Sequence, residues 1–317
     1  MKKFKLVGIG EVLWDLLPGG PQLGGAPANF VYHANSLGAK VALISRVGSD
    51  DFGRDILARF SSIELSAKTI QMDENAPTGT VTVTLSEQGV PEFIIHENVA
   101  WDRLLVTIPA LETVLDASAV CFGTLGQRNP IACAAIQELV AAAPAGAWRV
   151  FDVNLRQHFF SQDVIEKSLA LASVLKVNET ELPCLAKMWG LCGDERSLVA
   201  KLAERHHLRV VAYTRGGGGS LLFVDGRWSD HPGVPTNVVD TVGAGDAFTA
   251  AMTLGLLAGW PLDEINHHAN EVAAYVASRA GATPDLPERL RAPFTDALRG
   301  RPENALHSAK KTALDPK

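Results

Sequence analysis

The sequence predicts an α/β fold, in which a central and mainly parallel sheet is flanked by helices and carries a small β lid. Short apolar segments with the length of buried strands alternate with longer segments of helical periodicity along most of the chain. Clusters of glycine and polar residues follow directly after several of these strands. Residues 69–98 break the alternation, because their apolar residues recur at every second position. We therefore expect one α/β domain over residues 1–317 with a strand pair inserted into it.

The first strand leads into a glycine-rich segment that could bind a polyol. Lys5 to Ile9 predict a strand, and Leu13 stands where a dinucleotide-binding fingerprint would have its next glycine. Gly24-Gly25 precede a helix expected over Asn29 to Leu37. Free N–H groups at its start, the Asn29 amide and the Asp15 carboxylate offer hydrogen-bond partners for several hydroxyls. A plain loop with Asn29 as a helix cap is the alternative.

The next elements are a strand over Val41 to Arg46, a turn, and a helix over Gly53 to Phe60. Residues 78–95 then alternate valine or leucine with threonine, and a Glu-Gln-Gly turn leads into Phe93-Ile94-Ile95. This pattern is typical of a β-hairpin. Inserted into an α/β chain, the hairpin is a candidate lid, and the alternative is a hairpin that extends the main sheet.

The regular alternation returns at Ala119. Strands are expected over residues 119–124, 148–156, 173–178, 209–214 and 220–223, with a helix over 130–143. Asp152, Asn154 and Arg156 stand at or just past the end of one strand, and ligands of open α/β sheets bind at such carboxyl ends. A run of four glycines separates the last two strands but lacks the Gly-Lys-Ser/Thr end of a P-loop.

Residues 236–259 are the most informative segment. A short apolar run leads through Asp240-Thr241 into Gly243-Ala244-Gly245-Asp246, and a strongly apolar helix follows up to Gly259. The first N–H groups of a helix have no intrahelical partner and carry partial positive charge, so this turn predicts an anion hole for a phosphoryl group. Asp246 lies in the first turn, where its ionised form is favoured and can accept a proton from a hydroxyl.

Composition excludes several classes of protein. The 317 residues are 47% hydrophobic with a net charge of -6, which argues against general nucleic-acid binding. The apolar runs are too short for a membrane span, and the N-terminus is typical of a first strand rather than a signal peptide. The 4 cysteines lack metal-site spacing and predict a reduced, cytoplasmic protein. The adjacent histidine pairs His206-His207 and His267-His268 do not favour a zinc site.

Five motifs in order, over roughly residues 5–290, resemble those of the ribokinase-like (PfkB) sugar kinase family. They are Asp15 with the Gly24–Asn29 segment, Asp152-x-Asn-x-Arg156, Asn178-x-x-Glu181, Thr214-x-Gly-x-x-Gly219 and Asp240 to Asp246. The resemblance implies a ribokinase-like fold and ATP-dependent phosphorylation of a sugar hydroxyl. It also implies a lid formed by about residues 12–24 and 69–100, used to pair subunits in a homodimer. Residues 292–317 are expected to form a polar tail.

The same resemblance implies a role for individual residues. The sugar would be held by Asp15, Gly25, Asn29 and Asp246, with Arg103 as a further candidate. Asp246 would be the base, Gly243, Ala244 and Gly245 the anion hole, and Arg156 the cation against the transferring phosphoryl group. ATP would contact Asn178, Thr214, Gly216, Gly219, Gly245 and Asn270. Glu181 would order Mg²⁺ through water, and Asp240, Val242, Ala277 and Ala282 would surround a monovalent cation, K⁺.

The substrate and two other classes of function stay open. GEVLWDLLP, LGGAPANFVYHANSLG and IHENVAWD look most like fructokinases, followed by 2-keto-3-deoxygluconate kinases and then ribose or nucleoside kinases. Residues 78–95 contain no Lys or Arg, which favours a neutral sugar, although Arg103 could bind an acidic one. A dinucleotide oxidoreductase is disfavoured by Leu13. A catalytically silent sugar-binding regulator is disfavoured by the presence of Asp246 and Asn29.

Overall fold

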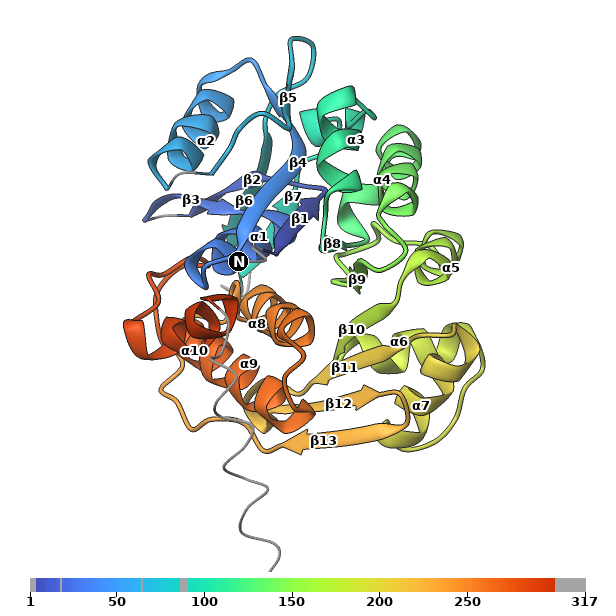
Figure 1. Ribbon diagram of the computed structural model, residues 1–317. Helices are drawn as coiled ribbons and strands as arrows, with labels where there is room; N and C mark the ends of the chain where they lie inside the picture. The colour runs from blue at the N-terminus through green and yellow to red at the C-terminus, as the bar shows by residue number, and fades with distance from the viewer. Residues whose placement is uncertain (1–3, 18, 64, 86–90, 300–317) are drawn as a thin grey trace, which may run out of the picture.

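The chain folds around a nine-stranded sheet in the computed structural model, which describes residues 4–17, 19–63, 65–85 and 91–299 (Figure 1). Its strands are β1 (Lys5–Ile9), β4 (Lys40–Gly48), β5 (Ile70–Asp73), β8 (Ala119–Phe122), β9 (Trp148–Asp152), β10 (Val174–Asn178), β11 (Val210–Thr214), β12 (Ser220–Val224) and β13 (Arg227–His231). The order is β13-β12-β11-β10-β9-β8-β1-β4-β5. From β5 through β4, β1, β8, β9 and β10 to β11, each strand pairs in parallel with the next. Strand β12 pairs antiparallel with β11, and β13 pairs antiparallel with β12. The expected mainly parallel sheet is therefore confirmed.

Helices cover both faces of this sheet (Figure 1). One face packs against α1 (Ala26–Ser36), α2 (Asp51–Ser62), α8 (Ala244–Ala258), α9 (Leu262–Ala277) and α10 (Glu288–Arg299). The other packs against α3 (Ile108–Leu115), α4 (Pro130–Ala142), α5 (Gln162–Leu171), α6 (Glu181–Met188) and α7 (Glu195–Arg205). Short 3₁₀ turns are η1 (Ala100–Arg103), η2 (Leu125–Gln127) and η3 (Gly216–Gly218). Neighbouring strand residues alternate between the two cores, as Val174 and Leu175 do in β10.

A second sheet has the order β3-β2-β6-β7. It consists of β2 (Leu13–Leu17), β3 (Gly20–Gly24), β6 (Gly79–Leu85) and β7 (Pro91–Ile95). The predicted hairpin thus belongs to a separate sheet and does not extend the main one, while its Glu-Gln-Gly turn lies outside the described residues. The predicted start of the second lid segment, near residue 69, was wrong. Strand β5 pairs with β4 in the main sheet, so the strands of this segment that join the second sheet begin at Gly79.

The predicted polar tail also starts too early. Residues 292–299 continue α10, whose Leu290 and Phe294 are buried against the core. This four-residue spacing puts both side chains on one face of the helix, which is sufficient to dock it. Residues 300–317 lie outside the described part of the chain.

The carboxyl ends of the parallel strands lie along one edge of the sheet, and β1 is the strand at which the strand order changes direction. The chain continues from β1 to β4 on one side, and β8, β9 and β10 lie on the other side. Ligands of open α/β sheets bind at such a switch point. No helix within the described residues combines the length and apolar character needed to cross a bilayer.

Candidate active site

The turn before α8 has a backbone conformation that suits ligand binding by main-chain N–H groups. Gly243 precedes the helix with φ 78°, a left-handed conformation that favours glycine. A Cβ at this position would overlap the backbone of Ala282, so no larger residue fits. The Ala244 N–H already donates to the Thr241 carbonyl over 3.3 Å, whereas the N–H groups of Gly245 and Asp246 lie in the first helical turn, where no intrahelical acceptor precedes them.

Asp246 lies in that first turn and is bonded to the sugar-binding candidate Asn29. The Asn29 Nδ2 donates to Asp246 Oδ2 over 2.8 Å, across 217 residues of sequence. Burial and, to a smaller extent, the nearby Asp152 carboxylate raise the pKa of Asp246 to about 6, against the opposing effect of the Asn29 hydrogen bond. A carboxylate that titrates near neutral pH beside an anion hole can act as a general base.

A buried ion pair that sequence analysis missed lies beneath the hole. Lys176 Nζ is 3.1 Å from Asp152 Oδ1, and the two side chains are 7% and 5% exposed. They are cross-strand neighbours in β10 and β9 and face α8, where Thr249 Oγ1 donates to Asp152 Oδ2 over 2.9 Å. A Cβ built on Gly245 would lie 3.1 Å from Lys176 Nζ, so the ammonium group adjoins the anion hole. The sequence did contain a signal for this ion pair, which is the lysine within the apolar strand VLKVN. A charged residue in a buried strand is expected to be paired or functional.

The N-terminal sugar candidates converge on the same place. Gly25 caps α1 with φ 105°, and a Cβ there would lie 2.6 Å from the Glu11 carbonyl oxygen. Asp15 is half-buried in the lid strand β2, and burial raises its pKa to about 6 while Arg156 opposes the rise. The Oδ1 atom of Asn29 is buried without a hydrogen-bond partner among the described residues. This acceptor is free for a sugar hydroxyl.

Glu11 is a second buried acid that the motifs did not reveal. Its side chain follows β1, is 1% exposed, and leaves Oε2 without a partner among the described residues. Burial raises the pKa of Glu11 to about 7, opposed by hydrogen bonds from backbone N–H groups including that of Ala26 at the start of α1. Glu11 therefore supports the helix that carries Asn29.

The two arginine candidates differ in their position relative to Asp246. Arg156 is exposed in the loop after β9, and its charge acts to lower the pKa of Glu11, Asp15 and Asp246. It is thus placed to face an incoming anion from the solvent side. Arg103 is exposed in η1, where its carbonyl accepts a hydrogen bond from Arg46 Nη1 over 2.9 Å. Among the described residues, no side-chain hydrogen bond or ion pair joins Arg103 to the Asp246 site.

The predicted nucleotide and magnesium residues lie at the neighbouring strand ends. Asn178 Oδ1 accepts from the N–H groups of Thr180 and Glu181, as a capping side chain does. Glu181 is buried and accepts from Leu155 N over 3.0 Å and from Asn178 N over 2.9 Å. Burial raises the pKa of Glu181. Because both of its oxygens already accept backbone hydrogen bonds, Glu181 fits a role toward Mg²⁺ through water better than direct ligation.

The glycine turn between β11 and β12 and helix α9 complete this side. Thr214 ends β11, and Gly216 and Gly219 have φ values of 52° and 81°. Asn270 is buried, and its Nδ2 donates to Ser220 Oγ over 2.7 Å and to Asn266 O over 2.8 Å. The Asn270 side chain therefore links α9 to β12 within the protein. Its contact with adenine stays a prediction.

Protein donors already contact several of the oxygen atoms that are predicted to surround a monovalent cation. Asp240 Oδ1 accepts from Val242 N over 3.0 Å, and Oδ2 accepts from Gly281 N over 3.1 Å. The Ala277 carbonyl already accepts from two backbone N–H groups, those of Val239 and Asp240. The Ala282 carbonyl is 2.9 Å from His33 Nε2. The Ala282 carbonyl oxygen keeps a second lone pair, and the monovalent-cation site at Asp240, Val242, Ala277 and Ala282 stays a prediction.

The adjacent histidines of α9 come together with Glu271 but form a hydrogen-bond chain. Gly233 N donates to His231 Nδ1, so the proton of neutral His231 is on Nε2 and points to His267 Nδ1, 3.3 Å away. His267 then carries its proton on Nε2, which faces Glu271 Oε2 at 3.5 Å.

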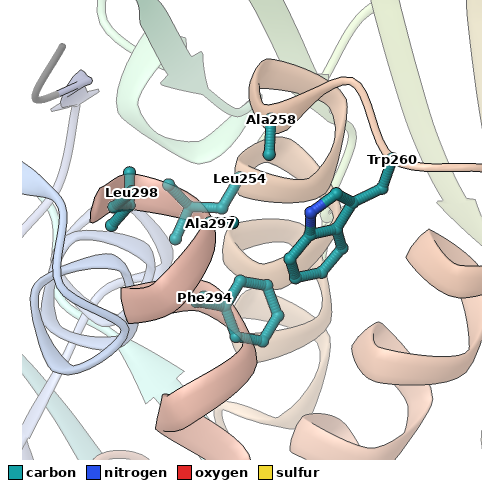
Figure 2. A pocket seen from close by; sticks show the side chains of 6 residues that line it. All are labelled: Leu254, Ala258, Trp260, Phe294, Ala297 and Leu298. Atoms are coloured by element: carbon teal, nitrogen blue, oxygen red, sulfur yellow. The ribbon is translucent and has the colours of Figure 1, made fainter. Parts of the chain in front are cut away.

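An apolar hollow at the other end of α8 is not the active site. Figure 2 shows its lining of Leu254, Ala258, Trp260, Phe294, Ala297 and Leu298, between α8 and α10. The side chains that line it are apolar and offer no group for acid–base chemistry. Along the axis of α8, Leu254 and Ala258 of this lining lie roughly 12 and 18 Å from Asp246.

The profile described as pfkB family carbohydrate kinase matches residues 21–289. The chain belongs to this family. As a pfkB kinase it is an ATP-dependent carbohydrate kinase with a ribokinase-like fold. The confirmed family explains why the Asn29, Asp246 and glycine motifs, which are far apart in sequence, meet at one switch point.

Relatives of this pfkB kinase match over most of its length. An uncharacterized sugar kinase of Pyrococcus horikoshii is 31% identical over 279 residues, which are 84% of this chain and 85% of the relative. A fructokinase of Klebsiella pneumoniae is 29% identical over 304 residues, 92% of this chain and 96% of the relative. The crystal structure of the Pyrococcus kinase in complex with ATP has a TM-score of 0.75 at 29% identity and covers 88% of this chain and 94% of that one.

Proposed function

We propose that this kinase transfers the γ-phosphoryl group of ATP to the 6-hydroxyl of fructose, giving fructose 6-phosphate. The observation that carries the proposal is the Asn29–Asp246 hydrogen bond at the N-terminus of α8. It puts a general base, a polar side chain for a sugar and a glycine anion hole within one turn of helix. Similarity to a fructokinase of Klebsiella pneumoniae supports the choice of sugar.

The residues divide the reaction between them. Asn29 and Asp15 hold the sugar so that one primary hydroxyl faces Asp246, whose carboxylate accepts the proton as the oxygen attacks phosphorus. The first N–H groups of α8 receive the charge on the transferring group, with Lys176 beneath the hole and Arg156 on the solvent side. Mg²⁺, held through water by Glu181 beside Asn178, would neutralise phosphate charge.

The charges near the site favour a neutral sugar over an acidic one. Arg103, the candidate partner for a substrate carboxylate, is exposed in η1 and bonded through its backbone to Arg46. The lid segment 78–95 has no Lys or Arg. Desolvating a carboxylate without a cation is costly, so fructose suits this lid better than 2-keto-3-deoxygluconate.

The proposal extends to a monovalent cation, a homodimer and a cytoplasmic enzyme. K⁺ would bind at Asp240 and carbonyls of the 277–282 loop, where it would order the turn before α8. Equal activity with and without added potassium would contradict the proposed K⁺ site. The homodimer would form through the lid, whose β7 exposes Phe93 and Ile94.

A coupled assay of ADP release with a panel of sugars tests the substrate. We expect kcat/KM for fructose to exceed that for ribose, adenosine and 2-keto-3-deoxygluconate. A preference for 2-keto-3-deoxygluconate that disappears in Arg103→Ala would overturn the fructose assignment and keep the kinase. No ADP release with any sugar would favour the silent sugar-binding regulator.

A further inference from the structure

One face of helix α1 makes two contacts with the catalytic region. Asn29 and His33 are four residues apart, so their side chains lie above one another on that face. Asn29 bonds Asp246 at the front of the anion hole. His33 reaches the loop between α9 and α10, which lies behind the hole.

His33 is fully buried and acts as a hydrogen-bond donor. Its side chain is 0% exposed, and Nε2 lies 2.9 Å from the carbonyl oxygen of Ala282. A carbonyl only accepts, so Nε2 carries the proton. The other ring nitrogen, Nδ1, is buried with no partner among the described residues. Burial lowers the pKa of His33 to about 4, so the ring is neutral near pH 7.

The carbonyl that His33 holds forms the rear wall of the anion hole. A Cβ built on Gly243 would lie within 2.7 Å of the Cα of Ala282 and would also overlap its carbonyl oxygen. The preceding residue of the same loop, Gly281, donates its N–H to Asp240 Oδ2 over 3.1 Å. The position of residues 281–282 therefore sets the backbone of the turn from which α8 begins.

We propose that His33 is a positioning residue for phosphoryl transfer: its bond to the Ala282 carbonyl fixes the loop against Gly243 and so aligns the anion hole with the helix that holds the sugar. The proposal goes beyond the choice of sugar, because any acceptor bound through Asn29 would need the same alignment. His33 does not touch the reacting atoms. Its effect should appear in turnover more than in binding of either substrate.

Three substitutions separate donation from packing. His33→Gln places an amide nitrogen close to the position of Nε2, whereas His33→Asn reaches only the position of Nδ1. His33→Leu keeps apolar volume and has no donor. We expect kcat to fall by about 10- to 100-fold in His33→Asn and His33→Leu, the usual range for a displaced catalytic group. KM for sugar and ATP should change by less than about threefold, and His33→Gln should recover most of the turnover.

Tyr32→Phe is the matched control. Tyr32 precedes His33 on α1 and donates to Asp285 Oδ1 over 3.2 Å, in the same loop but three residues beyond Ala282. It should lower thermal stability without a comparable loss of kcat. If His33→Leu keeps wild-type kcat while its Tm falls as in Tyr32→Phe, His33 is only a packing residue and the proposal is wrong. An equal loss in His33→Gln and His33→Asn would also overturn it.

Imidazole ¹⁵N NMR provides a readout that does not depend on the sugar. The spectrum should show His33 as the Nε2–H tautomer at pH 7, with no titration above about pH 5. A His33 signal that titrates near pH 6.5, or that shows the Nδ1–H tautomer, would contradict the bond. Because this experiment needs no substrate, its failure can be told from a failure of the fructose assignment.

Discussion

Residues that share one buried cluster acquire different chemical roles through their partners. Asp152 pairs with the ammonium group of Lys176, whereas Asp246 is bonded to the neutral amide of Asn29. Burial alone would lower the pKa of Lys176, but Asp152 and the acids around it raise it, so the lysine is charged. Among the described residues no cation is bonded directly to Asp246, and burial raises its pKa to about 6. The unpaired acid is therefore the better proton acceptor.

Asp246→Asn should remove the base and keep the fold. We expect kcat to fall by about 10² or more, the contribution typical of acid–base catalysis, with little change in the KM for ATP. The Tm at pH 8 should rise in this variant. The pKa of Asp246 is higher in the folded than in the unfolded protein, so its ionised carboxylate destabilises the fold at pH 8, and the neutral amide does not. Steady-state kinetics and calorimetry measure both effects.

Asn29→Ala is the matched variant for the opposite side of the same hydrogen bond. It should raise the KM for the sugar well above any effect on ATP, because the amide serves the sugar and not the nucleotide. A turnover near the wild-type value in Asp246→Asn, or equal rises in both KM values in Asn29→Ala, would contradict these roles.

The pH dependence of kcat/KM should report the same carboxylate. Asp246 must be deprotonated to accept a proton, so activity should be present above pH 6 and fall as the pH decreases through about 6. The Asn29 hydrogen bond lowers this pKa, so the acid limb should move to higher pH in Asn29→Ala. A limb near pH 4, the ordinary range of an exposed aspartate, would show that Asp246 is not the group that titrates.

At the scale of elements, a single arginine joins the base of the lid to the main domain. Arg128, just after η2, pairs with Asp102 of η1 through Nε–Oδ1 at 2.8 Å and Nη2–Oδ2 at 2.9 Å. Its Nη2 also donates to the carbonyl of His96, next to the end of β7. The guanidinium stacks 3.9 Å from the ring centroid of Trp101 and 4.7 Å from that of Phe159. Lid, η1 and η2 therefore share one nearly buried ion pair.

Arg128→Ala should destabilise the protein by about 3–5 kcal/mol, because it leaves the carboxylate of Asp102 buried without its partner. Arg128→Lys should recover only part of this loss, since an ammonium group cannot make the paired contacts or the stacking. Denaturant unfolding measures the free energy. Lys167→Ala, which breaks the exposed pair with Asp163, is the control and should cost less than about 1 kcal/mol. Equal effects at the two sites would exclude the anchoring role.

At the scale of the whole molecule, the sequence was informative wherever the signal is local. The strand of Lys5–Ile9 and the end of α8 at Gly259 follow from apolar runs and a terminating glycine, and both are confirmed. The partner of a short strand is a tertiary property, so β5 was assigned to the wrong sheet. The Lys176–Asp152 pair depends on the register of two parallel strands. Carbonyl acceptors such as that of Ala282 carry no side-chain signal at all.

The second sheet, which forms the proposed lid, has an apolar strand at its edge. Strand β7 lies at one end of the lid sheet, and its Phe93 and Ile94 side chains are 52% and 46% exposed. Edge strands with exposed apolar residues are prone to pair with a second strand. We infer that a second copy of this chain covers them, so that two lids pack together in a homodimer.

Light scattering after size exclusion tests this assembly. The wild type should elute as a dimer, and Ile94→Lys should shift it to a monomer, because a lysine cannot be buried cheaply at an apolar interface. Ile108→Lys is the matched control: Ile108 is 75% exposed on α3, in the main domain and outside the lid, so this variant should stay dimeric. A wild type that is monomeric at the concentrations of the kinetic assay would refute the lid dimer, and so would a dimer that Ile108→Lys dissociates and Ile94→Lys does not.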